Sequence, residues 1–401
     1  MEAKRILLLL ADWEGKENLA QFLSPLSGDW DMVFSRGIAQ ALELMASNPF
    51  HVLVVDPTLN TLALAEFINR VKMRHPDVSV FVWFEVESVR ALEGCLGTSL
   101  QTLSWDAGIT VIRDSLKRAM HLRNWLSSYN TRSLIAKMKE VPSLPQLYTQ
   151  IMRVLQNPAV EMEDIAVPLT QDPALCAKLL KTVNSALFGL SNPVANAYEA
   201  IMYLGVERTK SLVLFSQLIS QVNTFRCRRF SIDALWHHSL RSAAFARWIT
   251  QEEGCEMPLA DEAFTAGLLH DVGRLLLAAN LPDLYDFALN LVLQGKHDLA
   301  AAETQVFGIT HGEIGACLLG MWGLPVSILE AVAWHHSPGA SDSAGFCGLT
   351  AVHVADSMEN LMQNIQPGQP GAGLDMQYLA GLGFKDRIPV WRELCTTSIT
   401  S

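Results

Sequence analysis

Histidine and aspartate residues recur at several places in the second half of this 401-residue chain. Imidazole nitrogens and carboxylate oxygens bind divalent metals, and side chains from separate helices can converge on one metal site. A bound metal ion lowers the pKa of a coordinated water molecule, which then supplies hydroxide for attack on a phosphoester. The residues of this set are His237, His238, His270, Asp271, His311, His335, His336 and Asp356.

The adjacent pair His270-Asp271 is the most specific part of this set, because it lies within the string Gly267-Leu-Leu-His-Asp-Val-Gly273. The pair offers one nitrogen and one carboxylate that can bridge, which suits one or two divalent ions. A single histidine in a helical protein is more often an ordinary surface or core residue, and the neighbours His237 and His238 cannot both face inward. The joint pattern, rather than any one residue, therefore predicts a metal site.

The segments around these residues follow a helical pattern from Val141 onward. Apolar residues such as Leu175, Leu179 and Val183 recur with helical spacing, and prolines stand near the proposed helix starts. We expect helices at 143–156, 161–170, 233–250, 260–278, 283–294, 298–306, 311–321, 325–336 and 346–363. Residues 140–364 are thus predicted to form an all-α domain. A Gly/Pro/Gln-rich stretch that follows predicts a weakly ordered tail over 365–401.

The first third of the chain has a different pattern, in which short apolar runs alternate with amphipathic stretches. The predicted strands are Arg5–Leu10, Met32–Phe34, His51–Val55, Val78–Phe84 and Ile109–Ile112. Strands and helices that alternate at this pace indicate βα units and a parallel sheet. We therefore predict a five-stranded α/β domain over 1–126 and a helical linker over 127–139.

Acidic residues follow two of these predicted strands. Asp12 and Glu14 come after the first strand, and Asp56 follows the third. Ligands of open α/β sheets bind at the carboxyl ends of the strands, so these carboxylates mark a second candidate site.

Composition limits the partners and the compartment that can be expected. The formal net charge of −11 leaves no excess of cations to neutralise phosphates, which argues against nucleic acid or an anionic membrane as the main partner. Seven scattered cysteines without C-x-x-C spacing are typical of reduced thiols in the cytoplasm. We expect a cytoplasmic protein, since the sequence shows neither a signal peptide nor an apolar run of 18 residues.

The string Ala266–Leu275 resembles the HD superfamily of metal-dependent phosphohydrolases, and the wider context resembles its HDOD branch, the HD-related output domain. Similarity extends from about 134 to 360. The segments that carry it are Val141-Pro-Ser-Leu-Pro145, Gln171-Asp-Pro-Ala-Leu175, Val183-Asn-Ser-Ala-Leu-Phe-Gly189, Trp236-His-His-Ser239, His311-Gly-Glu-Ile-Gly315, Trp322-Gly-Leu-Pro325 and Trp334-His-His336.

This resemblance implies a metal set for Fe, Mn or Zn in which His238 is preferred to His237, because it occupies the family's His-Ser position. The implied ligands are His238, His270, Asp271, His311, His335, His336 and Asp356. HDOD domains are commonly regarded as non-catalytic relatives that often lack some ligands, whereas this sequence keeps them all. The related enzymes that hydrolyse cyclic di-GMP carry Gly-Tyr-Pro shortly after the His-His pair. Here Ser337–Gly345 lacks that motif, so this activity is poorly supported.

The placement of Asp56 resembles the phospho-accepting aspartate of response-regulator receiver domains in two-component systems. Asp12 and Glu14 would then hold Mg²⁺ beside it. Three departures make the resemblance degenerate. The usual paired acids are reduced to Ala11-Asp12, Trp83-Phe84-Glu85 stands where a Ser or Thr is expected, and Arg113-Asp114 stands where Lys-Pro is usual. Arginine binds phosphate with a planar fork rather than a compact ammonium, so this exchange is not neutral. These departures argue against phosphorylation and favour a module for dimerisation or docking.

Two functions remain open at this point. The first is a bacterial-type signal-transduction protein, in which a receiver-like domain regulates an HDOD output domain that acts through contacts with signalling proteins or within a homodimer. The second is a metal-dependent phosphohydrolase that acts on a nucleotide or phosphoester. A nucleic-acid-binding regulator is a weaker third alternative, because the chain is acidic.

Overall fold

The structure is a computed structural model, and its described residues divide between two compact units. The N-terminal unit comprises residues 1–127, 152–160 and 323–326, and the helical unit comprises 128–151, 161–322 and 327–401. The described residues are 4–9, 30–56, 59, 61–75, 78–84, 101–104, 113, 116–117, 120, 134–135, 138–155, 160–190, 192–222, 224, 226–295, 297–343, 345–362 and 373–400.

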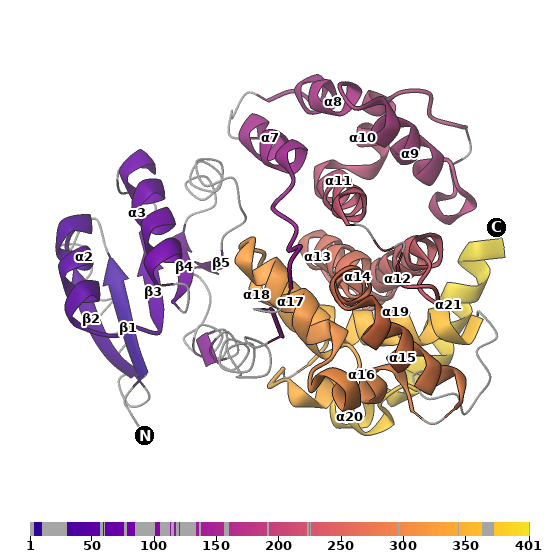
Figure 1. The fold of residues 1–401 in the computed structure, drawn as a ribbon. Coiled ribbons are helices and arrows are strands. Elements are labelled where there is room, and N and C mark those ends of the chain that lie inside the picture. The colour runs from indigo at the N-terminus through magenta and orange to yellow at the C-terminus, as the bar shows by residue number, and fades with distance from the viewer. Residues whose placement is uncertain are drawn as a thin grey trace. The chain divides into compact units, whose positions relative to one another are not determined.

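A parallel sheet forms the centre of the N-terminal unit (Figure 1). Its first four strands, β1 (Lys4–Leu9), β2 (Trp30–Ser35), β3 (Val52–Val55) and β4 (Ser79–Phe84), confirm four of the predicted strands. A short strand β5 (Gln101–Ser104) pairs with β4, which gives the order β2-β1-β3-β4-β5. The predicted fifth strand at Ile109–Ile112 lies outside the described residues. The segment of β5 was not predicted, because four residues with a single leucine give little apolar signal.

Both faces of this sheet are apolar, as expected for a parallel sheet. On one face Leu7, Leu53 and Val82 pack in a core to which the helices α2 (Ile38–Ser47) and α3 (Thr61–Arg74) also contribute. On the other face Leu8 and Val54 are equally buried. The central strands are therefore continuous apolar runs, and the sequence pattern identified them for that reason.

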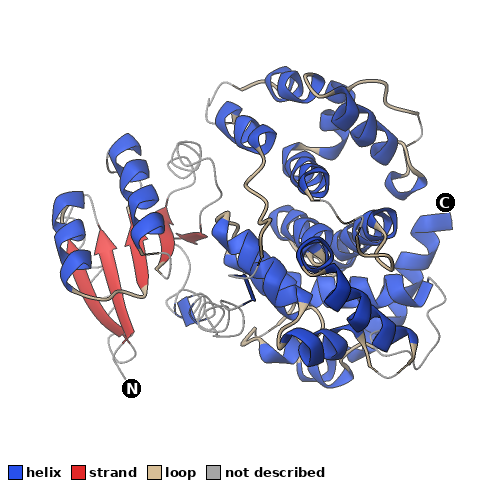
Figure 2. Ribbon diagram, in the orientation of Figure 1, coloured by secondary structure: helices blue, strands red, loops and turns tan. Residues whose placement is uncertain are grey.

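The rest of the described chain is helical, which confirms the predicted helical C-terminal region (Figure 2). The helices are α7 (Gln146–Val154), α8 (Met162–Thr170), α9 (Pro173–Val183), α10 (Ala197–Leu204), α11 (Val206–Gln221), α12 (Ile232–Glu252), α13 (Met257–Leu269), α14 (Val272–Asn280), α15 (Pro282–Leu293), α16 (Leu299–Phe307), α17 (His311–Met321), α18 (Val326–Trp334), α19 (Gly348–Met362), α20 (Met376–Gly381) and α21 (Ile388–Thr400), with the 3-10 turns η2 (Ala186–Phe188), η3 (Pro338–Ala340) and η4 (Lys385–Arg387).

Two glycines allow the helices of the helical unit to pack closely. A Cβ atom at Gly267 would lie 2.9 Å from the Cα of Ala243, so α13 can approach α12 only without a side chain there. A Cβ atom at Gly273 would lie 1.9 Å from the carbonyl oxygen of His311, which likewise sets the approach of α14 to α17. Both glycines flank His270-Asp271, so they fix the helix spacing where the candidate site lies.

The C-terminal segment differs from the predicted weakly ordered tail over 365–401. Residues 373–400 form α20, η4 and α21, and the side chains of Trp391 and Cys395 are fully buried. The indole N–H of Trp391 donates to the Glu253 carboxylate over 2.8 Å, and Arg387 donates to the same carboxylate. The sequence predicted a weakly ordered tail because the Gly/Pro/Gln-rich stretch indicated disorder, although apolar residues follow it. Among the described residues, no helix is both long and apolar enough to cross a membrane.

Candidate metal centre

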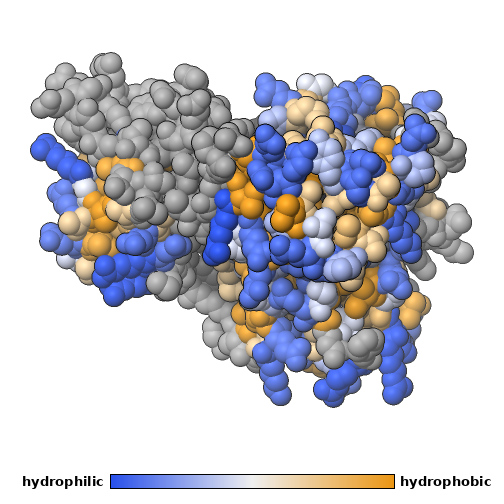
Figure 3. Space-filling model, turned by 90° about the horizontal axis from the view of Figure 1, so that it is seen from above, coloured by the Kyte–Doolittle hydropathy of each residue, from blue (hydrophilic) through white to orange (hydrophobic). Residues whose placement is uncertain are grey.

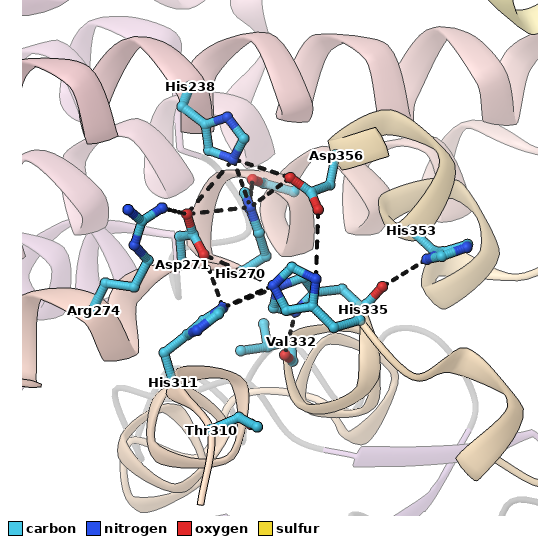
Figure 4. Close-up of polar contacts among 12 residues, drawn as sticks. His238, His270, Asp271, Arg274, Thr310, His311, Val332, His335, His353 and Asp356 are labelled. Carbon is cyan, nitrogen blue, oxygen red and sulfur yellow. Dashed lines mark hydrogen bonds and ion pairs between the residues drawn. The ribbon is translucent and has the colours of Figure 1, made fainter. Parts of the chain in front are cut away.

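Seven side chains predicted as metal ligands converge in the helical unit (Figure 4). His238 comes from α12 and Asp356 from α19, His270 and Asp271 lie at the junction of α13 and α14, and His311 begins α17. The remaining two directly follow α18. Their ligand atoms form two groups, each within 4.8 Å: His238, His270 and Asp356, and Asp271, His311, His335 and His336. The structure thus brings all seven together, while their role as ligands stays a prediction.

The first group lies between α12, α13 and α19. The Nε2 atom of His238 is 3.1 Å from the Nε2 of His270 and 3.1 Å from a carboxylate oxygen of Asp356. The same oxygen is 3.7 Å from His270 Nε2. Ligand atoms in a tetrahedral site with metal–nitrogen bonds of about 2.0–2.1 Å stand roughly 3.3 Å apart, so this spacing suits a shared ion.

The second group is centred on His311. Its Nε2 atom lies 3.1 Å from Asp271 Oδ1 and 3.2 Å from the Nε2 atoms of both His335 and His336. The other oxygen of Asp271, Oδ2, is 3.6 Å from Nε2 of His238 in the first group. The Asp271 carboxylate therefore faces one group with each oxygen, which is the arrangement expected of a carboxylate that bridges two ions.

Backbone carbonyls fix the tautomers of two histidines. Nδ1–H of His270 donates to the carbonyl of Gly267 over 2.7 Å, and Nδ1–H of His335 donates to that of Val332 over 2.8 Å. A carbonyl only accepts, so the proton of each neutral ring lies on Nδ1 and the lone pair of Nε2 points into the centre. Metal-bound histidines are commonly held in this way.

Buried glutamates hold two further histidines of the set, His238 and His311. Nδ1 of His238 is 2.5 Å from the Glu359 carboxylate, and Nδ1 of His311 is 2.6 Å from that of Glu303. Both glutamates are fully buried. Within each group, Nε2 atoms thus lie about 3 Å apart: those of His238 and His270 by 3.1 Å, and those of His311 and His335 by 3.2 Å. A proton or a metal ion between the nitrogens would offset the repulsion of their lone pairs. The donor set fits a divalent transition metal.

The electrostatics of the centre favour anionic carboxylates. Burial alone would raise the pKa of Asp271, but Arg274, 2.6 Å away, and His270 hold it well below its usual value. Burial acts in the same direction on Asp356, where hydrogen bonds with His238 and His270 outweigh it and lower the pKa. Both carboxylates are therefore available as ligands at neutral pH.

Carboxylates raise the pKa values of two of the histidines, His238 and His311. Burial lowers the pKa of His238, but hydrogen bonds with Asp356 and Glu359 raise it overall to about 10. Burial likewise opposes protonation of His311, while Glu303 and Asp271 raise its pKa to about 10. Protons on these two rings, or one divalent ion in their place, supply two positive charges.

The charge balance of the metal centre also calls for two positive charges. Four buried carboxylates, those of Asp271, Asp356, Glu303 and Glu359, face two guanidinium groups, which leaves two negative charges. The guanidinium groups belong to Arg274, bonded to Asp271, and Arg241, bonded to Glu359 over 2.5 Å. Uncompensated buried charge is costly, so two further positive charges are needed in the metal centre, from protons or from a metal ion.

Several supporting residues were missed by the sequence analysis. Arg274 and Glu359 each lie three positions after a predicted ligand, Asp271 and Asp356, on the same helical face, and this spacing could have indicated them. Glu303 lies on a different helix from His311, and no local spacing points to it. His353 was also missed: its Nδ1–H donates to the carbonyl of His335 over 2.7 Å.

The second candidate site, in the N-terminal unit, is only partly described. Asp56 follows β3, its side chain is buried, and its backbone N–H donates to the carbonyl of Leu9 over 2.9 Å. Asp12 and Glu14 lie outside the described residues. The acidic Mg²⁺ pocket and phosphorylation of Asp56 therefore stay predictions.

Comparison with known sequences finds a family match that covers most of the helical region. The HDOD domain family matches residues 141–338. An uncharacterised protein of Treponema pallidum (strain Nichols) is 28% identical over 208 residues, which cover 51% of this chain and 39% of that protein. The chain therefore spans well under two thirds of this relative.

Solved structures share the fold at low identity. An HDOD domain protein of unknown function from Geobacter sulfurreducens superposes with a TM-score of 0.55 at 22% identity, over 71% of this chain and 94% of its own. A protein from Marinobacter aquaeolei VT8, provisionally named as a signal transduction protein, gives 0.52 at 16% identity, over 96% and 88%. One from Shewanella amazonensis SB2B, provisionally named as a phosphohydrolase, gives 0.50 at 21%, over 69% and 98%. The family match identifies residues 141–338 as an HDOD domain, and the solved structures share its fold.

Proposed function

We propose that this chain is a signal-transduction protein whose HDOD domain is a metal-loaded output module. The observation that carries the proposal is the convergence of seven oriented ligands, with Nδ1–H of four histidines bonded outward and Nε2 directed inward. Such complete outer support is expected where a metal is retained. The names of the solved relatives, which include a signal transduction protein and a phosphohydrolase, agree with either an output or an enzymatic role.

The burial of the ligands favours a stable, organising ion. Six of the seven residues are buried, and His336 alone has a quarter of its side chain exposed. Metal binding at such a site joins α12, α14, α17 and α19, and its free energy adds to that of folding. The metal-loaded domain then presents a fixed surface to a partner.

We also propose that the N-terminal unit is a degenerate receiver-like module with a flavodoxin-like fold. The strand order β2-β1-β3-β4-β5 and the position of Asp56 at the end of β3 support this interpretation. Its regulatory input would reach the HDOD domain through contacts with signalling proteins or a second copy of the chain.

Exposed apolar residues of the helical unit support such contacts. Val167 on α8 and Met202 on α10 are each 55% exposed, and the two helices pack against each other. Figure 3 shows apolar patches among polar side chains on the upper face of the protein. Apolar surface of this kind is often used in protein–protein contacts.

The metal content of the purified full-length chain tests the main proposal. We expect at least one equivalent of Fe, Mn or Zn by elemental analysis, and its loss in Asp271→Asn. The control Asp283→Asn changes a carboxylate in the first turn of α15 and should leave the content unchanged. Absence of stoichiometric metal from the wild-type chain, after growth with each metal, would refute the proposal.

Phosphoester hydrolysis is the second candidate function. It is favoured by Asp271, whose two oxygens face the two ligand groups, because paired divalent ions about 3.5–4 Å apart activate water and stabilise a phosphoryl group. Within this chain, Asp271 and Asp356 would supply anionic ligands, and Arg274 would hold Asp271 in place. A screen of nucleotides and p-nitrophenyl phosphate decides between the two functions: turnover that Asp271→Asn abolishes favours the enzyme, and metal without turnover favours the output module.

A further inference from the structure

A pocket separate from the metal ligands lies between α9, η2 and α12 in the helical unit. Its volume is about 370 Å³, which lies near the lower end of the range of about 300–1,000 Å³ typical of small-molecule sites. We call it the cationic pocket, because its lining includes Lys178, Lys181 and Arg241.

The lysines of the cationic pocket form no ion pair with the residues that the structure describes. The ammonium of Lys178 lies 3.7 Å from the ring centroid of Trp236, and burial lowers its pKa while Asp233 partly opposes this. Phe215 stacks on Trp236 at 5.2 Å, which holds the indole in place. Within the described part of the chain, neither Lys178 nor Lys181 forms an ion pair. Two lysines are therefore available to an anion.

Arg241 is held in position at the edge of the same pocket. Its guanidinium donates to the buried Glu359 carboxylate over 2.7 Å from Nε and 2.5 Å from Nη2, and about a third of its side chain stays exposed. Glu359 also accepts from His238, so Arg241 connects the cationic pocket with the metal centre. A guanidinium fixed in this way binds an anion with little loss of side-chain entropy.

The charge of the pocket contrasts with that of the whole chain. Among the described residues that line it, two lysines and one arginine stand against one carboxylate, that of Asp233, whereas the protein carries a formal net charge of −11. Leu187, Ile232 and Leu240 supply an apolar wall. Cations beside an apolar wall suit a ligand that has an anionic group and an organic part.

We propose that the cationic pocket binds a small phosphate-bearing molecule. Lys178 and Lys181 contact the phosphate group as point charges, and Arg241 offers its remaining donors. The organic part lies against Leu187 and Leu240. Lys178 and Phe215 already pack on the ring of Trp236, so the organic part is placed on the aliphatic wall rather than stacked on that ring.

Isothermal titration of the metal-loaded full-length chain with AMP tests this site. The double variant Lys178→Gln/Lys181→Gln should weaken binding at least tenfold, because two charge-assisted contacts are lost. Asp233→Asn should tighten binding, since it removes the carboxylate of Asp233 from the pocket lining. The control Lys385→Gln removes an exposed positive charge on η4 and should leave the affinity unchanged.

A phosphate can also bind at the metal centre, so Asp271→Asn separates the two sites. We expect this variant to lose metal but to keep its affinity for AMP. Loss of AMP binding in Asp271→Asn, with full binding in the double lysine variant, would place the ligand at the metal and overturn the proposal without harming the proposed function. Unchanged melting and metal content of the lysine variant would show that it is folded.

Inorganic phosphate identifies what the pocket recognises. Tighter binding of AMP than of inorganic phosphate supports the role of the apolar wall. Equal binding of both overturns that role, and no lysine-dependent binding of either at millimolar concentration overturns the proposal as a whole.

Discussion

The two sides of α12 show how adjacent residues of one type acquire different roles. His238 is buried, its Nδ1 bonded to Glu359 and its Nε2 directed at His270 and Asp356. His237, one position earlier, is exposed and lines the cationic pocket. The metal centre is built of buried carboxylates and imidazoles, whereas the cations of the pocket, Lys178, Lys181 and Arg241, are partly or fully exposed. The difference teaches that residue type alone does not define a ligand; the partners from other helices do.

The largest expected effect comes from adding a side chain where α14 and α17 are in close contact. In Gly273→Ala the new Cβ would meet the carbonyl oxygen of His311 at 1.9 Å, so the helices must separate. We expect a loss of about 3 kcal/mol or more in the free energy of unfolding by urea denaturation, together with loss of metal. Gly381→Ala on α20, where a Cβ has nothing within 4 Å, is the matched control. A stable, metal-loaded Gly273→Ala would show that the site tolerates wider helix spacing.

Replacing each of the two adjacent histidines separately tests the comparison on α12 itself. His238→Gln removes a ligand and should weaken metal binding by more than about 100-fold, beyond the cost of losing an outer partner. His237→Gln should leave metal affinity unchanged. The measurement is competition with a chromophoric chelator. Equal effects of the two variants would contradict the assignment of His238 as the inward residue.

The pH dependence of metal affinity follows from the protons that the metal displaces. Without metal, His238 and His311 have pKa values of about 10, so both are protonated at neutral pH. Metal affinity should therefore rise with pH between about 6 and 9, by roughly tenfold per pH unit for each proton released, and fall as the pH drops. Chelator competition at several pH values measures this slope. A flat profile would show that these rings carry no proton in the metal-free protein.

The smallest of these effects concerns a residue that does not touch the metal. Glu303→Gln replaces the acceptor of His311 Nδ1–H with a neutral amide and should weaken metal binding about 10–100-fold without unfolding the domain. Glu393→Gln, on the exposed side of α21, is the control. If Glu303→Gln binds metal as tightly as the wild type, the outer carboxylates do not tune the centre.

Local pattern made much of this protein predictable. Continuous apolar runs such as Val52–Val55 identified the central strands, and helical spacing identified most helices of the HDOD domain. Short β5 and the C-terminal helix α21 were missed, because four polar-rich residues carry little signal and because a Gly/Pro/Gln-rich stretch suggested disorder beyond it. Trp391 and Cys395 are buried only because α21 packs in the fold, which composition does not reveal.

The sequence by itself determined which side chains could bind metal, since residue types and motif strings such as Ala266–Leu275 are local properties. Only the tertiary structure decided how they are used. The two-sided position of Asp271, the support of His311 by Glu303 and the cluster of Lys178, Lys181 and Arg241 depend on distances between helices far apart in the chain. The physical reason is that spacing along one helix fixes a face, whereas packing of several helices fixes what that face meets.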